Sequence, residues 1–241
     1  MNLEIILLLS LVVFCSHFIG ALTGFGCTIL AIPFTISLIG PEGAKPVLII
    51  LALIQCGVVV IQTFKDINWK ELKKIVLLVS LGMPIGILAY SLMSKKLLVD
   101  ILSIFMILIS IKGFLELKGY EFKAPKDYIL NIILFIGGII HGAFVSGGPL
   151  IMVYSTEKIK DKNVFRATMC MIWIILNLIL MTQEIVGGNY TKDVLIYTVL
   201  TMPSLIFGVL LGSKLSSKVN QRLFSYIIYT VLVITALFNF L

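Results

Sequence analysis

The chain alternates apolar runs with short polar breaks or with breaks that contain glycine and proline. Because about 20 apolar residues are needed for a helix to cross a bilayer, the runs predict membrane helices. We expect ten segments, at roughly 3–23, 26–40, 45–64, 72–93, 97–117, 128–142, 144–156, 166–186, 193–213 and 222–241. The second, sixth and seventh are short for a full crossing, so each is expected either to cross or to form half of a re-entrant hairpin.

Composition supports this interpretation. Of 241 residues, 59% are hydrophobic and 13% are charged, with a mean hydropathy of +1.11. These values lie far from those of soluble domains. The sequence therefore predicts an all-α, polytopic helix bundle with one transmembrane domain over 1–241 and no enzymatic domain. Segment 3–23 lacks the basic start of a signal peptide, so we expect it to be a helix of the mature protein.

The basic residues divide unevenly between alternate loops. All 19 lysines and arginines fall on one side except Lys45, Lys95, Lys96 and Lys192. The positive-inside rule places the richer side in the cytoplasm and both termini outside, in the cytoplasmic membrane. The basic residues in the cytoplasmic loops explain the net charge of +7, so no nucleic-acid partner is expected. The four cysteines lie in apolar segments without a C-x-x-C pair, so no metal or other cofactor is expected.

The two halves of the chain resemble each other at a fixed offset. A shift of 121 residues aligns 24–69 with 145–190, and it places Gly147 on Gly26 and Arg166 on Lys45. At a shift of 122, Gly86 falls on Gly208. The alignment predicts repeats at 1–118 and 119–241, each with five segments, including a glycine-broken helical hairpin. An odd number of segments inverts the second repeat, a plan common among secondary transporters.

Each repeat has a glycine-rich break at membrane depth, "TGFGCTILAIP" at 23–33 and "HGAFVSGGPLIMVY" at 141–154. Irregular backbone is tolerated there only when it is buried in protein or lines a cavity. The helix after each break starts with unpaired N–H groups, which favour an anion. The predicted substrate-binding residues are Gly24, Phe25, Gly26, Cys27, Thr28, His141, Ser146, Gly147, Gly148, Pro149, Gln55 and Asn177. Close helix packing is the alternative, and it fits Gly20-x-x-x-Gly24 and Gly138-x-x-x-Gly142 well.

Other polar residues in the apolar segments narrow the chemistry. Besides Gln55, His141 and Asn177, they are His17, Gln62, Thr182 and Gln183. Taken singly, each is better explained by an interhelical hydrogen bond than by contact with a ligand. The acids Asp100, Glu157 and Glu184 lie near segment ends, so a carboxylate-based cation site is hard to build and an anionic substrate is favoured. Lys45 and Arg166 stand at equivalent helix starts, where they could gather anions at each mouth or anchor the helices at the interface.

At these residues the sequence resembles the TauE/SafE (TSUP) family of membrane transporters. "GALTGFGCTILAIP" and "GGIIHGAFVSGGPLIMV" resemble its paired glycine-rich signature, and Met83-Pro84 and Met202-Pro203 recur after it. Cys27 and Thr28 depart from the pattern, since further glycines are usual there. The resemblance implies transport of sulfur-containing anions such as sulfite, thiosulfate or sulfoacetate.

The leading hypothesis is a secondary transporter that moves a small anion by alternating access of inverted repeats. Its partners would be the anion and the lipid bilayer, and a homodimer is left open. An anion channel or a non-transporting scaffold is the alternative. An intramembrane hydrolase using Ser146 and His141 is a remote third hypothesis, because a nucleophile needs an adjacent base and oxyanion donors.

Overall fold

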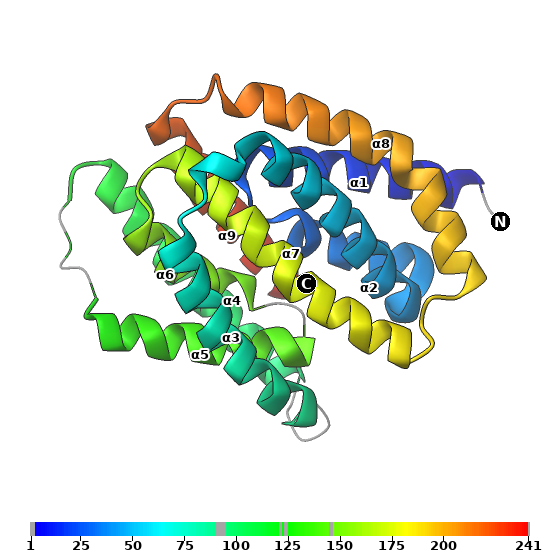
Figure 1. The fold of residues 1–241 in the computed structure, drawn as a ribbon, viewed down its shortest axis with the longest axis horizontal. Coiled ribbons are helices and arrows are strands. Elements are labelled where there is room, and N and C mark those ends of the chain that lie inside the picture. The colour runs from blue at the N-terminus through cyan, green and yellow to red at the C-terminus, as the bar shows by residue number, and fades with distance from the viewer. Residues whose placement is uncertain (1–2, 90–94, 121, 123–124, 145–146, 241) are drawn as a thin grey trace. The chain divides into compact units, whose positions relative to one another are not determined.

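The computed structural model describes residues 3–89, 95–120, 122, 125–144 and 147–240 (Figure 1). Within these residues it contains nine α-helices, one short 3-10 helix and no strand, which confirms the all-α prediction. The elements are α1 (Leu3–Thr23), α2 (Cys27–Thr63), η1 (Phe64–Asp66), α3 (Trp69–Ala89), α4 (Lys95–Leu117), α5 (Asp127–Phe144), α6 (Gly148–Lys158), α7 (Lys162–Val186), α8 (Lys192–Ser216) and α9 (Gln221–Phe240).

The helices follow the predicted segments closely, with one fusion. Helix α2 covers the segments predicted at 26–40 and 45–64, because the chain is helical on both sides of a kink at Gly40. Gly40 has φ 76° and ψ 164°, a conformation open to glycine, and Pro41 follows it. Proline is tolerated in the first turn of a helix, where its missing N–H has no partner. The kink therefore divides α2 into two helices, as the segment pattern predicts.

Four helices among the described residues are long and apolar enough to cross a membrane. They are α1, α2 together with η1, α7 and α8. Helix α6 has 11 residues, which span about 16 Å against a hydrocarbon core of about 30 Å. It cannot cross a bilayer alone, so it belongs to a broken or re-entrant element.

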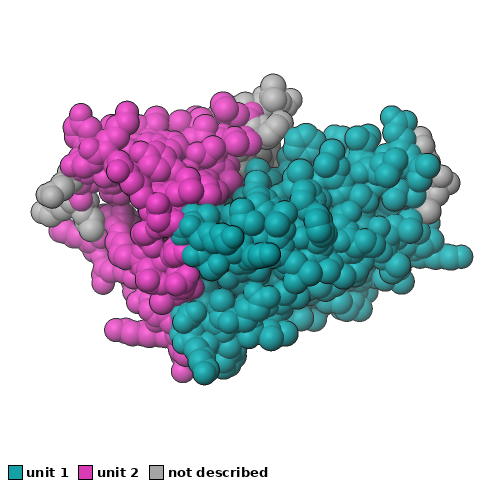
Figure 2. Space-filling view, turned by 90° about the horizontal axis from the view of Figure 1, so that it is seen from above, with its two compact units in different colours: residues 1–67, 166–219 teal, residues 68–165, 220–241 magenta. Residues whose placement is uncertain are grey.

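The chain divides into two compact units, coloured separately in Figure 2. Unit 1 comprises residues 1–67 and 166–219, and it holds α1, α2, most of α7, and α8. Unit 2 comprises residues 68–165 and 220–241, and it holds α3, α4, α5, α6 and α9. Each unit therefore combines helices from both predicted repeats.

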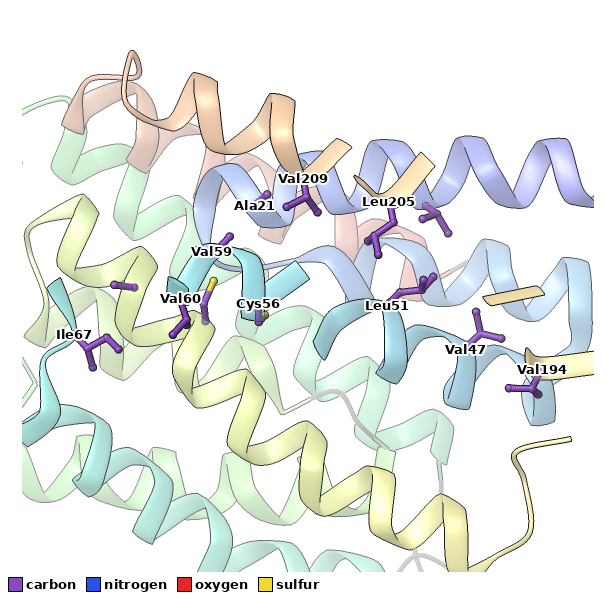
Figure 3. Packing of buried hydrophobic residues seen from close by; sticks show 13 residues of the cluster. Ala21, Val47, Leu51, Cys56, Val59, Val60, Ile67, Val194, Leu205 and Val209 are labelled. Carbon is purple, nitrogen blue, oxygen red and sulfur yellow. The ribbon is translucent and has the colours of Figure 1, made fainter. Parts of the chain in front are cut away.

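Unit 1 is organised around the contact between α1 and α8, which run side by side in Figure 1, and α2 packs against both. Glycines on α8 allow the close approach. A Cβ at Gly208 would lie 2.8 Å from the carbonyl oxygen of Phe14. Leu205 and Val209 of α8 point toward α1 and α2 (Figure 3). The buried cluster contains Val13, Ala21, Val47, Leu51, Cys56, Val59, Val60, Ile67, Ala167, Cys170, Val194, Leu205 and Val209.

Unit 2 has the same kind of close pair, formed by α3 and α5. Gly138 and Gly142 of α5 lie against the carbonyl oxygens of Val79 and Met83, so close that a Cβ at either glycine would overlap them. The packing interpretation of Gly138-x-x-x-Gly142 is therefore confirmed. Helix α4 packs on α9, and α6 folds back on α5.

We predict that Gly138→Ala lowers the free energy of unfolding by about 1–3 kcal/mol, because the added methyl group forces backbone apart. Thermal unfolding in detergent measures the loss. Gly57→Ala is the matched control, since a Cβ at this helical glycine meets nothing within 4 Å. Alanine there should be neutral or stabilising by up to about 1 kcal/mol. Equal stability of the two variants would contradict the close contact.

Candidate anion site

The break between α1 and α2 depends on two glycines with left-handed backbone. Gly24 has φ 78° and Gly26 has φ 93°. The N–H of Gly24 still donates to the carbonyl oxygen of Gly20 at 2.7 Å, which completes the end of α1. Gly26 then precedes α2 and supplies no side-chain cap. Because Gly24 has positive φ, the backbone of the break itself requires glycine there, and helix packing alone does not explain this residue.

Arg166 of α7 lies against this break and is only 6% exposed. Its Nε donates to the carbonyl oxygen of Ala21 at 2.5 Å, and its Nη2 donates to Ser213 Oγ at 2.8 Å. Ala21 is in the last turn of α1, where helix carbonyls carry partial negative charge. A Cβ at Gly24 would lie 2.9 Å from the Cα and the carbonyl oxygen of Arg166. The arginine therefore joins α1, α7 and α8 at the break.

The charge of Arg166 has no acidic partner among the described residues, where the ion pairs use other cations. Two of its five guanidinium donors are used by Ala21 and Ser213. Burying a charge is costly unless it is paired and hydrogen-bonded. A neutral hydroxyl and one carbonyl oxygen do not neutralise it, so this position favours an anion.

His17 and Gln55 provide further polar groups beside the same break. His17 is fully buried, and its Nδ1 donates to Gln55 Oε1 at 2.6 Å. Its other ring nitrogen, Nε2, is buried without a hydrogen-bond partner in the part of the chain that the structure describes. A Cβ at Gly20 would lie 2.6 Å from Cys27 Cβ and 2.7 Å from Gln55 Nε2. Gly20 therefore brings α1, the start of α2 and Gln55 together.

A buried stripe on α7 faces this region. Arg166, Cys170, Trp173 and Asn177 follow a spacing of four, three and four residues, which places them on one helix face. Trp173 Nε1 donates to the carbonyl oxygen of Gly24 at 3.0 Å, and its ring lies 6.4 Å from that of Phe25 between centroids. The buried thiol of Cys170 interacts with those of Cys27 and Cys56 on α2. The predicted Gly24–Thr28 segment, Gln55 and Arg166 thus come together, and Asn177 is buried two turns beyond Cys170.

The other end of this stripe carries Glu184, which is 4% exposed. Its Oε1 forms an ion pair with Lys45 Nζ, and its Oε2 accepts from Asn189 Nδ2 at 2.7 Å. Lys45 was predicted to gather anions at a mouth or to anchor its helix. In the structure the half-buried ammonium of Lys45 is paired with the buried carboxylate of Glu184.

The second break lies in unit 2 between α5 and α6 and is built differently. Gly147 has φ −69°, so it does not need the left-handed region. A Cβ there would overlap the carbonyl oxygen of Gly137, and therefore close approach demands the glycine. Gly148 and Pro149 are buried in the first turn of α6, and His141 is 3% exposed on α5. Ser146 lies outside the described residues, so the hydrolase hypothesis has no geometry to support it.

Unit 2 also contains two cavities of about 190 and 200 Å³ beside α4, α6 and α9. Both are lined by Glu116, Thr156 and Tyr229. Lys112 forms ion pairs with Glu116 at 3.1 Å and with Glu157 at 2.5 Å. Burial raises the pKa of Glu157, but the hydrogen bonds and charges of Lys112 and Lys160 together outweigh it and hold that pKa below its usual value. One cation shared by two acids leaves no excess positive charge there, so the cavities do not favour an anion.

A comparison of the sequence with known families identifies the family of the chain. A profile described as sulfite exporter TauE/SafE matches residues 9–239, which is nearly the whole chain. The chain belongs to the TauE/SafE family. It is therefore a multi-pass membrane transporter rather than an enzyme. No curated protein and no solved structure matches it.

Sequence reasoning on this TauE/SafE protein missed several residues at the site. Trp173 and Ser213 were left out, although the spacing of Arg166, Cys170, Trp173 and Asn177 on one face was a usable signal for Trp173. His17 was named only as one polar residue among several. Three others of that set, Gln62, Thr182 and Gln183, are exposed and do not contribute.

We predict that Gly24→Ala destabilises the protein more than Gly188→Ala. Both glycines have positive φ, which costs alanine about 1–2 kcal/mol. Only at Gly24 does the new Cβ also meet the backbone of Arg166, whereas at Gly188 it meets nothing within 4 Å. The extra loss should be about 1–3 kcal/mol, measured by thermal unfolding. Equal losses would show that Arg166 does not pack on the break.

Proposed function

We propose that this TauE/SafE protein is a secondary transporter that moves a small sulfur oxyanion, such as sulfite, across the cytoplasmic membrane. Its binding site in unit 1 is the break between α1 and α2, beside Arg166. One observation carries the proposal: a guanidinium that is 6% exposed has no carboxylate partner among the described residues.

The chemistry of the site suits a small oxyanion. A guanidinium presents planar, paired N–H donors that match the oxygens of carboxylates and oxyanions. The start of α2 adds backbone N–H groups without a side-chain cap. The buried Nε2 of His17 can accept a hydrogen bond from a protonated oxyanion. A cationic substrate would meet the Arg166 charge with no described carboxylate to offset it.

Matching contacts within the two units support the inverted-repeat proposal. Gly208 of α8 lies against the carbonyl oxygen of Phe14 and the nitrogen of Phe18 on α1. Gly82 of α3 lies against the same two atoms of the residues 121 positions later on α5, Phe135 and Ile139. The contacts thus pair Gly82 with Gly208. The sequence alignment pairs Gly86 with Gly208, one helical turn away.

These contacts also give each unit the same composition. In both, the first segment of one repeat packs on the fourth segment of the other repeat, as α1 with α8 and α5 with α3. The repeats proposed at 1–118 and 119–241 would therefore exchange helices. We propose that this arrangement alternates access to the anion site, with both termini outside the cytoplasm.

Arg166→Gln should abolish saturable sulfite flux into proteoliposomes, because the site loses its only strong charge while keeping hydrogen-bond capacity. Flux of sulfite, sulfate, thiosulfate and sulfoacetate is measured side by side. Arg222→Gln is the matched control, since Arg222 is exposed and its guanidinium donates to the carbonyl oxygen of Leu117. It should transport like the unmodified protein.

Size-exclusion chromatography and thermal unfolding confirm that each variant is folded before flux is compared. Normal flux in folded Arg166→Gln would remove Arg166 from the site. Absence of saturable flux for every anion in the unmodified, folded protein would refute the proposed function.

Alternating access predicts reciprocal labelling of a cysteine placed at Thr28, in a background that lacks the four native cysteines. A membrane-impermeant thiol reagent is applied from either side while a sulfoacetate gradient is imposed. Reversing the gradient should raise labelling from one side and lower it from the other. A channel would instead show labelling rates that do not change reciprocally. The cysteine-free background must retain flux and stay unlabelled.

A further inference from the structure

The two ends of the α7 stripe hold buried side chains of opposite charge, and these side chains have different kinds of partner. Near one end, Arg166 is buried with neutral hydrogen-bond partners. Near the other, Glu184 is buried and paired with Lys45. The two residues are 18 positions apart, which is about 27 Å along a helix. Each therefore belongs to a separate site at its own end of α7.

Lys45 and Arg166 occupy equivalent positions in the two repeats, but the residues around them differ. Arg166 stands 121 residues after Lys45, and Glu184 stands 121 residues after Thr63. Thr63 is uncharged, and its hydroxyl donates to the carbonyl oxygen of Val59 at 2.8 Å. The acid that neutralises Lys45 thus has no counterpart for Arg166. Of the two equivalent cations, Lys45 is therefore paired with a carboxylate of the protein, and Arg166 is not paired with one among the described residues.

The surroundings of Glu184 provide anion-binding groups beyond Lys45. Asn189 Nδ2 donates to Glu184 Oε2 at 2.7 Å. The hydroxyl of the next residue, Tyr190, is buried without a hydrogen-bond partner in the described part of the chain. Burial, with a smaller contribution from Glu184, raises the pKa of Tyr190 to about 12, so it stays a neutral donor. An ammonium and an amide thus contact one carboxylate, and a neutral phenol hydroxyl is buried on the residue that follows the amide.

We propose that the Glu184 carboxylate is a tethered anion, which occupies beside Lys45 the place that a transported anion takes beside Arg166. This inference rests on the proposed function of the Arg166 site. Glu184 closes the Lys45 position to free anions, so the protein binds one oxyanion although its repeats supply two equivalent cations. The ligands that Glu184 keeps away from Lys45 are small oxyanions.

Glu184→Gln tests the proposal, because glutamine keeps the shape of the side chain and removes its charge. Isothermal titration with sulfite, in detergent and without oxygen, should give one site in the unmodified protein and two in Glu184→Gln. Lys45→Gln combined with Glu184→Gln should return the number to one. Glu42→Gln is the matched control, since Glu42 is an exposed acid on the same helix as Lys45. It should leave one site.

A single sulfite site in folded Glu184→Gln would overturn the tethered anion while leaving the proposed function intact. Arg166→Gln separates the two ideas further. Alone it should bind no sulfite, and combined with Glu184→Gln it should bind one, at Lys45. No binding to the unmodified protein would overturn the proposed function. In that case one site in Glu184→Gln would still support the tethered anion, and none would overturn it.

Discussion

The arrangement of unit 1 depends on holding one guanidinium inside an apolar bundle without a carboxylate. Arg166 is tolerated because α1 ends beside it and offers a carbonyl oxygen, that of Ala21, while Ser213 offers a hydroxyl. Both partners are weak substitutes for an anion, since each carries only partial charge. The end of α1 must therefore lie where it does, and so must the glycines that follow it. The position of the guanidinium and the shape of the break are therefore linked.

Glycine serves two separate purposes in this chain, and the two breaks show them apart. At Gly24 and Gly26 the backbone takes positive φ, so the chain can leave α1 and begin α2 within a few residues. At Gly147 the backbone is ordinary, and the close approach of Gly137 and His141 excludes a side chain. The breaks look alike in sequence because both purposes select the same residue. Their structures differ because only the first needs an unusual conformation.

The helical segments and the kink near Gly40 could be predicted from sequence, because apolar length and glycine-proline breaks depend on local chemistry. The grouping of helices into units could not, since α1 packs on α8 through residues nearly 200 positions apart along the chain. The candidate site was partly predictable: Gly24–Thr28 were named from the break, Gln55 as a polar residue in an apolar segment, and Arg166 from the repeat, as a mouth residue or an anchor. Trp173 and Ser213 were not named, because the bond from Trp173 to the Gly24 carbonyl oxygen and that from Arg166 to the Ser213 hydroxyl join residues far apart in the sequence.

Glu184 shows where the rule about buried acids needs refinement. Its position near the end of an apolar segment suggested solvent or headgroups, and acids near helix ends usually find them. Here the chain turns back after α7 and brings Asn189 and Tyr190 over the carboxylate, while Lys45 arrives from α2. Distance from a segment end therefore does not measure burial when the following loop folds inward. A carboxylate buried against a cation also removes that cation's charge from its surroundings, so an ion pair inside the bundle changes which positions carry excess positive charge.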